Sequence, residues 1–480
     1  MTIEKTNLLI DGEDIATSSY LEVRDPGRVA DVVGLLAQGD ARHVDRSVQA
    51  AHRAFLDWRQ TTPEHRAGLL LKAADVLAAE AASVIELMAR ESGMLVPINK
   101  AEIGMAASIV RDNAEMAPAF LRSKEVEDEA SWVGVEKEAF GVVAAIVPWN
   151  APVILTMRKL APALACGNTI VIKPAPTAPL GISILLKKIA ALFPPGVVNI
   201  VHGGVEVGRA LVTHPLVRKI SFTGGGAVAK DIMKSAADTI KSVQLELGGN
   251  DPAIVLQDAD LKDAIPKIIG GAFRRSGQFC FAVKRIYVPE AMHRTFVDLF
   301  CAEVAKFKVG HPLDAGTTFG PMNNKGQFDF VSGLIERTRR SGAQVIELGS
   351  KVSPDRWDEG FYLMPTVVAD ASPDLDVVTV EQFGPVVPIV AYRNEDEVVA
   401  MANQTELGLG SSVWSTDFKK AVALARRIEA GMTFINQAGT SRLGQRNIPF
   451  GGVKQSGIGR ESSEVGLAEY VEYHAINYHK

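Results

Sequence analysis

The sequence holds little cysteine, little net charge and no long apolar run. Its three cysteines, Cys166, Cys280 and Cys301, are too few for a disulfide framework or a zinc cage. A formal net charge of -5 over 480 residues provides no basic field for binding nucleic acid. No apolar run reaches the roughly 18 residues that a membrane span needs, and residues 1–7 lack the features of a signal peptide. We therefore expect a cytoplasmic protein with no nucleic-acid partner, no membrane partner and no metal.

The dinucleotide-binding fingerprint G-x-G-x-x-G is also missing, although the composition is that of an ordinary globular protein. Hydrophobic residues make up 47% and charged residues 22% of the chain, which is normal for a soluble fold. A chain of this length is expected to form two or three domains with substantial cores.

Apolar residues in the first third recur at helical spacing, and we expect this third to be helical. One such series is Val44, Val48, Ala51 and Phe55. Pro63 suits the first turn of a second helix, and a third helix is expected between about residues 97 and 120. The charged run at 124–129 indicates an exposed connection or the start of an edge strand.

Beyond residue 139, short apolar strands alternate with helices. The expected strands cover 141–147, 169–172, 197–201, 219–222, 253–256, 285–288 and 469–473, and the expected helices 182–192, 205–212, 261–274 and 291–307. Such alternation predicts an α/β fold built from parallel sheets with helices on both faces. Ligands of these sheets bind beyond the carboxyl ends of the strands, which is where reactive residues are expected.

Cys280 follows Gly277 and Gln278 at the end of the expected 261–274 helix. The thiolate is the attacking form of a catalytic cysteine, and a neighbouring glycine leaves room for substrate. Free cysteine is also among the most buried residue types, so a core cysteine is the competing interpretation. We expect that structural role for Cys166 and Cys301, which lie in apolar helical segments.

Glu246 and Asn150 each follow a strand-like segment. A carboxylate such as Glu246, held near a thioester, deprotonates the water that hydrolyses it, and partial burial raises its pKa towards working pH. The amide of Asn150 is a candidate hydrogen-bond donor to a developing oxyanion. Taken alone, Glu246 also fits a surface residue that caps a turn, and Asn150 fits an ordinary turn residue.

The segment Phe222-Thr-Gly-Gly-Gly226 joins a strand to a helix that is expected to start near Ala227. Free backbone amides at a helix N-terminus favour a pyrophosphate group. A tight glycine turn without any ligand explains the same residues equally well.

Several motifs, in this order and spacing, resemble the aldehyde dehydrogenase superfamily over almost the whole chain. They are Pro148-Trp-Asn150, Lys173-Pro174, Phe222-Thr-Gly224, Glu246-Leu-Gly-Gly249, Gly277-Gln-Phe-Cys280, Glu381-Gln-Phe-Gly-Pro385 and Pro449-Phe-Gly-Gly-Val-Lys-Gln-Ser-Gly457. The sequence as a whole is similar to a bacterial, broad-specificity branch of that superfamily. The resemblance implies two Rossmann-like parallel-sheet domains, one for the cofactor and one for catalysis, and a small β oligomerisation element.

The resemblance also implies domain boundaries. The dinucleotide-binding domain would comprise 1–117 and 140–248, the catalytic domain 249–449, and the oligomerisation element 118–139 and 464–480. Members of the superfamily are usually homodimers or homotetramers, so we expect the chain to bind itself.

The implied reaction is NAD(P)-dependent oxidation of an aldehyde to its carboxylic acid. The Cys280 thiolate adds to the aldehyde, Asn150 and the Cys280 backbone amide hold the oxyanion, and hydride leaves for the nicotinamide. Glu246 then activates the water that hydrolyses the thioester. Lys159 lies near the catalytic centre in similar proteins and is expected to assist proton movement.

The resemblance further assigns cofactor contacts. Glu381 would hold the nicotinamide ribose, Phe383 would pack beside the nicotinamide, and Lys173 would contact the adenosine ribose. The other expected contacts are Trp149, Pro176, Phe222, Thr223, Gly224, Gly225 and Leu247.

Pro176 departs from the superfamily pattern, because many NAD-preferring members have glutamate there. Without that acid nothing repels a 2'-phosphate, so both NAD and NADP are expected to serve, with NAD favoured. Gly225 replaces the usual serine and Ala229 the usual glycine, and both changes are small.

The substrate residues are expected at Arg158, Arg274, Phe279 and Phe281. Succinate-semialdehyde dehydrogenases carry arginines at the positions of Arg158 and Arg274, where they hold the distal carboxylate of the substrate. An arginine pair binds a carboxylate through directional, charge-assisted bonds, so we expect an aldehyde with a distal acid group. The alternatives are structural ion pairs for these arginines and an aromatic or apolar substrate between Phe279 and Phe281. Arg275 receives no role.

Three other classes compete with this interpretation. Coenzyme-A-acylating relatives generally lack the glutamate at the position of Glu246. A non-catalytic protein would have no reason to combine Cys280, Glu246, Asn150 and Glu381. A thiol hydrolase would share Cys280 but would not need Glu381 or Lys173.

Overall fold

The computed structural model describes residues 4–439 and 443–479, so residues 1–3, 440–442 and 480 of the predicted domains lie outside the described residues. The chain begins with strands where we expected helices. Strands β1 (Glu4–Thr6), β4 (Tyr20–Asp25) and β5 (Arg28–Ala37) form a small sheet, and β2 (Leu8–Ile10) and β3 (Glu13–Ile15) join a larger one. The helical expectation is therefore wrong for residues 4–37. Strands β1, β2 and β3 have three residues each, which is too short to show a period of two, and β2 pairs with β10, which lies far along the chain.

The three helices expected after these strands are confirmed. They are α1 (Ala41–Trp58), α2 (Pro63–Ser92) and α3 (Val96–Phe120). The side chain of Asp40 accepts hydrogen bonds from the first turn of α1, and Thr62 caps α2 just before its initial proline. Helix α2 ends at Gly93, whose φ of 77° lies in the left-handed region that glycine adopts without strain.

The first large sheet has the strand order β24-β12-β11-β8-β9-β10-β2-β3, and its five central strands are parallel. Their bounds are β8 (Val142–Ile146), β9 (Thr169–Lys173), β10 (Val198–Ile200), β11 (Val217–Thr223) and β12 (Ser242–Glu246), with β24 (Gly457–Ile458) antiparallel at the edge. The connecting helices are α4 (Pro152–Ala165), α5 (Leu180–Ala190), α6 (Val205–Thr213) and α7 (Gly226–Ala237).

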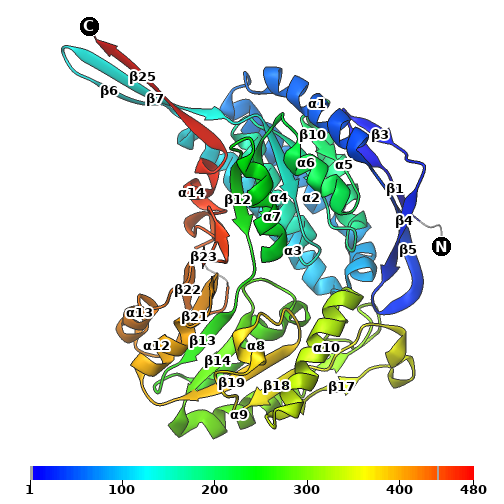
Figure 1. Cartoon of the computed structure of the whole chain (residues 1–480), viewed down its shortest axis with the longest axis vertical. Coiled ribbons are helices and arrows are strands. Elements are labelled where there is room, and N and C mark those ends of the chain that lie inside the picture. The colour runs from blue at the N-terminus through cyan, green and yellow to red at the C-terminus, as the bar shows by residue number, and fades with distance from the viewer. Residues whose placement is uncertain (1–3, 440–442, 480) are drawn as a thin grey trace.

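Both faces of this sheet are covered, as the alternation predicts. Val143 and Ala145 pack in one cluster with α2, α3, α4 and α5, whereas Val142 and Ala144 pack in another with α1, α6 and α7. Successive side chains of a strand point to opposite faces, so a continuous apolar run serves two cores. Figure 1 shows this α/β layer in the upper half of the molecule.

The second large sheet has the order β16-β18-β19-β14-β13-β21-β22, and only β16 is antiparallel to its neighbour. Its strands are β13 (Asp251–Val255), β14 (Val283–Pro289), β16 (Gln344–Glu347), β18 (Thr366–Ala369), β19 (Val386–Tyr392), β21 (Gly410–Trp414) and β22 (Met432–Ile435). Helices α8 (Leu261–Phe273) and α9 (Glu290–Val304) cover one face. The other face carries α10 (Lys325–Arg340), α11 (Asp376–Thr379), α12 (Glu395–Asn403) and α13 (Phe418–Ala425).

Two pairs of short strands form separate two-stranded sheets. They are β15 (Lys308–Val309) with β17 (Ser350–Lys351), and β20 (Leu407–Gly408) with β23 (Val453–Lys454). A third sheet projects from the body at the upper left of Figure 1. It pairs β6 (Lys124–Glu127), β7 (Ser131–Ala139) and β25 (Val471–His479) antiparallel in the order β25-β7-β6. The charged run at 124–129 does begin an exposed edge strand. The tail strand was expected at 469–473 but runs from Val471 to His479, after α14 (Ser463–Ala468).

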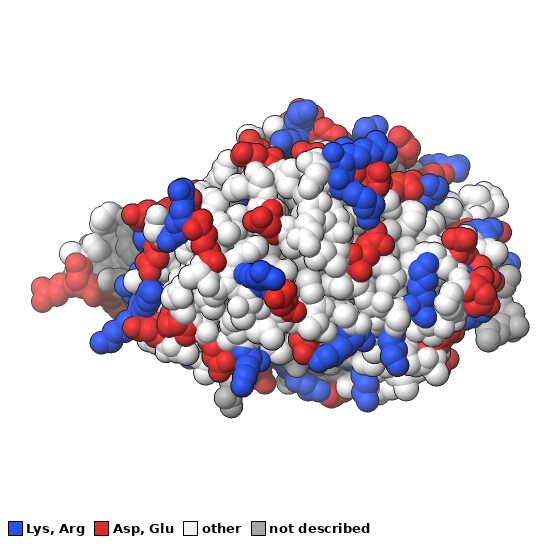
Figure 2. All heavy atoms as spheres, turned by 90° about the horizontal axis from the view of Figure 1, so that it is seen from below, with Lys and Arg blue, Asp and Glu red and all other residues white. Residues whose placement is uncertain are grey.

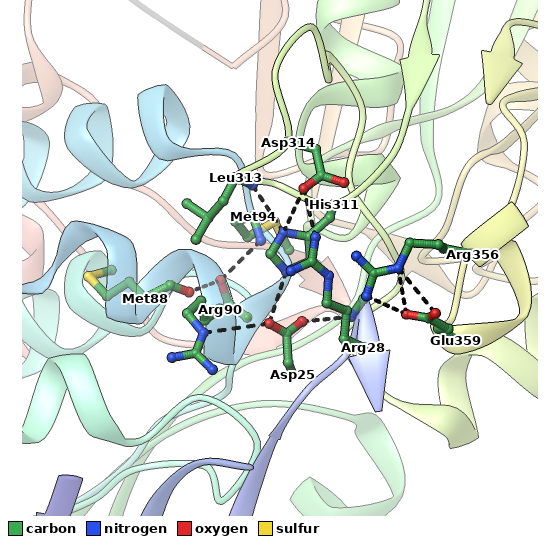
Figure 3. A network of polar contacts seen from close by, with 12 residues as sticks. Asp25, Arg28, Met88, Arg90, Met94, His311, Leu313, Asp314, Arg356 and Glu359 are labelled. Atoms are coloured by element: carbon green, nitrogen blue, oxygen red, sulfur yellow. Dashed lines mark hydrogen bonds and ion pairs between the residues drawn. The ribbon is translucent and has the colours of Figure 1, made fainter. Parts of the chain in front are cut away.

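A buried polar network joins the N-terminal strands to both halves of the molecule (Figure 3). Asp25, at the end of β4, accepts a hydrogen bond from Nε2 of His311 at 2.9 Å and lies 3.8 Å from Nε of Arg90 on α2. Arg28 forms an ion pair with Asp314 at 2.7 Å. Since His311 and Asp314 follow β15, these contacts connect the second half of the chain to α2 and to the N-terminal strands.

No helix in the described part of the chain combines the length and the apolar character that crossing a membrane requires. Figure 2 shows acidic and basic side chains interspersed over the lower face of the molecule, with no area of a single charge.

Candidate active site

The parallel strands of the first large sheet end together at one edge. Ile146 at the end of β8 pairs with Lys173 at the end of β9, and Thr223 at the end of β11 pairs with Glu246 at the end of β12. Parallel strands bring their carboxyl ends to a common edge, so residues distant in sequence line one cleft. Glu246 lies at one of these ends and Asn150 shortly beyond another, whereas Cys280 comes from the turn before β14 of the second sheet.

A left-handed turn presents Cys280 to this cleft. Helix α8 ends at Phe273, and Arg275, Ser276 and Gly277 then follow with φ values of 55°, 56° and 74°. A Cβ at Gly277 would lie 2.2 Å from the carbonyl oxygen of Gly384, so only glycine fits there. The chain therefore turns sharply out of the helix and directs the next residues towards the strand ends.

Cys280 lies where two cavities meet. The arginine cavity contains Arg158, Arg274, Phe279 and Phe281 in its wall, between α3, α4 and the turn after α8. The glycine cavity is lined by Trp149, Thr223, Gly224, Gly225, Glu246, Leu247, Glu381 and Phe383. Cys280 and Asn150 line both cavities. Cys280 is only partly buried, unlike Cys166, so the core-cysteine interpretation does not describe its position.

The surroundings of Cys280 disfavour its thiolate in the resting protein. Burial raises the pKa of the thiol to about 12, and the charge of Lys284 opposes that rise. The carboxyls of Glu246, Asp251 and Glu381 add to it, since a negative charge nearby disfavours a second one.

Asn150 is fixed near Cys280 by its own side chain. Its Nδ2 donates to the carbonyl oxygen of Gln278 at 3.1 Å, and the residue is 4% exposed. Because that hydrogen bond uses one of two amide hydrogens, the other is available to a group in the cavity.

Glu246 is an almost completely buried carboxyl whose two oxygens have no hydrogen-bond partner among the described residues. Burial and the negative charge of Glu461 raise its pKa well above the usual range, and the cations Lys159, Arg158 and Arg460 oppose the rise. A carboxylate that is so weakly stabilised binds a proton strongly, which is the property required of a base. The interpretation as a surface residue does not fit this position.

Lys159 forms a buried ion pair with Glu461. Its Nζ donates to Oε1 of Glu461 at 2.9 Å, and both side chains are fully buried. Glu461 is itself placed by an antiparallel bridge to Phe450, in the glycine-rich segment near the C-terminus. The charges of this pair act on Glu246 in opposite directions, since Glu461 raises its pKa and Lys159 lowers it.

The glycine cavity combines a free helix end with an aromatic pair. Helix α7 begins at Gly226 after Gly225, with no side-chain cap, and Thr223 Oγ1 is buried without a hydrogen-bond partner among the described residues. Trp149 and Phe383 meet edge to face, with centroids 5.7 Å apart. Oε1 of Glu381 accepts a hydrogen bond from the amide of Gly249 at 3.1 Å.

Three expected cofactor residues do not line this cavity. Phe222 is buried beneath Gly224, where an added Cβ would lie 2.3 Å from its ring. Lys173 is the last residue of β9 and Pro176 follows it, and burial lowers the pKa of Lys173 to about 8. The glycine cavity thus contains the residues expected near the nicotinamide, whereas Lys173 and Pro176, which are expected near the adenosine, lie outside it.

The two arginines of the other cavity have different surroundings. Arg158 stacks over the ring of Phe450 at 4.1 Å, and its Nη1 lies 3.4 Å from Oε2 of Glu461. The structural ion pair that we considered is therefore present at Arg158. The Arg274 guanidinium lies 5.1 Å over the ring of Phe279 and has no ion pair among the described residues.

Sequence reasoning missed three groups of the site. Lys284, Glu461 and Glu102 are buried here, but each lies outside the motifs. A lysine inside the apolar run of residues 281–288 and a glutamate directly after a glycine-rich segment were the available signals. Arg275 gains a role, because its guanidinium donates to the carbonyl oxygen of Asn150 at 2.8 Å and to Oε2 of Glu102 at 2.6 Å.

Known proteins share this fold and much of this sequence. A 3-sulfolactaldehyde dehydrogenase of Pseudomonas putida is 35% identical over 473 residues, which are 98% of this chain and 96% of the relative. The crystal structure of a betaine aldehyde dehydrogenase from Staphylococcus aureus in complex with NAD+ has a TM-score of 0.93 at 30% identity, covering 98% of this chain and 94% of that one. An NADP dependent enzyme of E. coli has a TM-score of 0.94 at 32% identity, covering 99% and 98%.

The model of the aldehyde dehydrogenase family matches residues 14–476, which is nearly the entire chain. The expected fold class, with two parallel-sheet layers and a small β element, agrees with the structures of that family. The chain belongs to the aldehyde dehydrogenase family.

Proposed function

We propose that this protein oxidises an aldehyde with a distal acid group to the corresponding carboxylic acid, using NAD or NADP. Membership of the family supports an oxidoreductase that acts on aldehydes. The distal acid group is inferred mainly from Arg274, a cation in the wall of the arginine cavity.

Arg274 is desolvated without a compensating acid. Burial and the neighbouring charge of Arg275 lower the pKa of Arg274, and no carboxylate among the described residues forms an ion pair with it. Placing a guanidinium in such surroundings costs free energy unless an anion joins it. An anionic end of the substrate, bound while its carbonyl carbon reaches Cys280 in the same cavity, would supply that anion.

Two further observations support an acidic substrate. Arg158 lines the same cavity and contributes a second guanidinium, although Glu461 shares it. The Pseudomonas putida relative is named for 3-sulfolactaldehyde, which is an aldehyde with an acidic end.

The chemistry follows from the residues at the junction of the cavities. The Cys280 thiolate attacks the carbonyl carbon, while the Asn150 amide and the Cys280 backbone amide donate hydrogen bonds to the oxyanion. Oxidation leaves an acyl group on Cys280 as a thioester. Glu246 takes a proton from water, the resulting hydroxide attacks the thioester, and the acid leaves as the thiolate is restored. The positive charge of Lys159 favours the carboxylate form of Glu246 and so assists proton movement at this base.

A nicotinamide dinucleotide fits the glycine cavity, where its nicotinamide would accept the hydride. The free amides of the α7 N-terminus and the buried Thr223 hydroxyl are unused donors that suit the pyrophosphate. Trp149 and Phe383 offer an aromatic wall, and the Glu381 carboxylate offers acceptors for ribose hydroxyls.

We propose that the protein uses both NAD and NADP as cofactors and favours NAD. Lys173 lies buried at the end of β9, and Pro176 leaves no acid to repel a 2'-phosphate. Pro176→Glu should raise the ratio of kcat/KM for NAD over NADP by about tenfold or more, because a carboxylate would then repel that phosphate. Pro354→Glu, on an exposed turn far along the chain, serves as the matched control. An unchanged ratio in Pro176→Glu would place the adenosine ribose elsewhere.

An aromatic or apolar aldehyde is the second candidate substrate. Phe279, Phe281 and Phe450 pack edge to face in series, with centroids 5.1 Å and 5.6 Å apart. Such a wall binds an apolar tail without help from Arg274.

A comparison of aldehydes in wild type and Arg274→Ala tests the proposal. Succinate semialdehyde should be preferred to hexanal, and the variant should lose on the order of 10- to 100-fold in kcat/KM for the semialdehyde alone, because hydrogen bonds to a charged group are lost. Arg340→Ala, on the exposed end of α10, should change neither substrate. Equal losses on both aldehydes, or a preference for benzaldehyde and long aliphatic aldehydes, would favour the apolar candidate.

A further inference from the structure

Lys284 is a buried lysine at the second position of β14, a strand whose every residue is buried. Its side chain is 2% exposed. Burying an ammonium group is costly unless oxygen atoms surround it. The identity of those oxygens therefore indicates what this lysine does.

The ammonium group of Lys284 binds the peptide carbonyl groups on both sides of the Cys280 α-carbon. Its Nζ donates to the carbonyl oxygen of Cys280 at 2.9 Å and to that of Phe279 at 3.0 Å. These are the two residues that carry the thiol into the cleft, and their carbonyl groups are thereby turned towards β14. The Lys284 side chain thus fixes the backbone at Phe279 and Cys280.

Lys284 also reaches the glycine cavity. Its Nζ lies 3.6 Å from Oε1 of Glu381 and 5.7 Å from the ring centroid of Phe383. Glu381 and Phe383 come from a loop roughly a hundred residues further along the chain. The lysine consequently joins the nucleophile to the residues that line the opposite wall.

Three carboxyls and one ammonium group shift the pKa of the Cys280 thiol, and the wall of the arginine cavity also carries Arg158 and Arg274. Asp251 on β13, Glu246 on β12 and Glu381 each raise the pKa of the thiol, and Lys284 lowers it. Burial raises the pKa of Asp251 to about 7, and Lys284 opposes that rise as well. Among these described groups, Lys284 is the cation that favours the thiolate.

We propose that Lys284 is a positioning residue that fixes the backbone at Phe279 and Cys280 and holds a positive charge beside the Cys280 thiol. This inference rests on the proposed role of Cys280 as the nucleophile. It concerns the reactivity of the thiol before any aldehyde binds.

The test is the rate at which iodoacetamide alkylates Cys280, measured against pH in the protein without cofactor. Modification at Cys280 is identified by peptide mass spectrometry. Lys284→Met removes both the charge and the hydrogen bonds, Lys284→Gln keeps a donor without charge, and Lys284→Arg keeps the charge. A nearby opposite charge shifts a pKa by about one unit or more. Lys284→Met and Lys284→Gln should therefore react about tenfold more slowly at neutral pH, with profiles displaced to higher pH.

Lys284→Arg should keep a profile close to that of the wild type, and Lys306→Met, at an exposed ion pair after α9, should leave it unchanged. Thermal melting of every variant separates misfolding from an electrostatic effect, and Lys284→Gln carries the test if Lys284→Met does not fold. Unchanged profiles in Lys284→Met and Lys284→Gln, or an equal displacement in Lys284→Arg, would overturn the proposal. Absence of any labelling at Cys280 would instead contradict Cys280 as the nucleophile.

Discussion

Burial acts in the same direction on the two side chains that we propose to react, Cys280 and Glu246. It raises the pKa of the Cys280 thiol to about 12, and together with Glu461 it raises the pKa of Glu246 well above normal. The Cys280 thiol is therefore protonated in the resting protein near neutral pH, and Glu246 keeps its proton to a higher pH than an ordinary carboxyl does. The proposed mechanism requires the deprotonated form of each, because in it the thiolate attacks and the carboxylate takes a proton from water.

The pH dependence of turnover follows from these directions. A group whose pKa is raised loses its proton only at higher pH, so the reactive fraction grows as the pH rises. We expect kcat to increase from neutral into alkaline pH, which steady-state rates across a buffer series would measure. A maximum on the acidic side of neutrality would contradict the assignment of either group.

Residues whose role depends on local sequence could be predicted, and residues that act through distant contacts could not. Cys280, Glu246 and Asn150 lie in short motifs beside glycine, and the structure brings all three to one junction of cavities. Lys284 carries no motif, since its partners Cys280 and Glu381 become neighbours only in the fold.

At the scale of elements, a buried ion pair connects α3, α4 and the turn before Cys280. Oε1 of Glu102 on α3 accepts a hydrogen bond from the Val153 amide at 2.8 Å, at the start of α4, where no capping side chain is present among the flanking residues. Oε2 of the same carboxyl binds Arg275, which in turn holds Asn150. Helices α3 and α4 and the turn before Cys280 thus together position Asn150, the predicted hydrogen-bond donor to the oxyanion.

Breaking this pair should destabilise the protein strongly. Glu102→Gln and Arg275→Met should each lower the free energy of unfolding by about 3 kcal/mol or more, because one buried charge remains unpaired. The double variant should cost less than the sum of the two, and both single variants should lower kcat more than they raise KM. Denaturant unfolding and steady-state kinetics measure these effects.

The exposed pair Lys267–Asp263 on α8 provides the comparison. Asp263→Asn should change stability by less than about 1 kcal/mol, as exposed pairs usually do. Additive costs for Glu102→Gln and Arg275→Met would show that the two side chains do not act together.

Element boundaries were predictable where the apolar period is long. Helices α1 and α2 repeat their buried positions over 18 and 30 residues, so their periods are evident. Strands β2 and β3 have three residues each; β2 takes its place from pairing with β10, and β3 from pairing with β2. The left-handed turn at 275–277 was not predictable, because arginine and serine rarely adopt positive φ and a fixed tertiary contact is needed to hold them there.

For the whole molecule, the projecting sheet is the part whose purpose the single chain does not explain. Strand β25 lies at the edge of the order β25-β7-β6, and Tyr473 and Tyr478 on it are 60% and 59% exposed. Exposed apolar side chains on an open strand edge are typical of interfaces. This supports the predicted self-association, while the predicted domain boundaries stay a prediction.

We expect the protein to be a dimer or tetramer held partly by this sheet. Tyr473→Asp combined with Tyr478→Asp should shift the assembly towards smaller species, because two charges would replace apolar contacts. Light scattering coupled to size-exclusion chromatography gives the mass. Phe418→Asp, a change at an exposed phenylalanine on α13, controls for loss of any exposed aromatic residue. An unaltered mass in the double variant would assign the interface to another surface.

The most direct test of covalent catalysis by Cys280 with hydrolysis by Glu246 is a single-turnover experiment on Glu246→Gln. Mixed with succinate semialdehyde and NAD, this variant should release about one reduced cofactor per active site and then stall, because the thioester forms but is not hydrolysed. Intact-protein and peptide mass spectrometry should find the acyl group on Cys280. Sustained turnover at the wild-type rate, or a burst without an adduct on Cys280, would contradict the account.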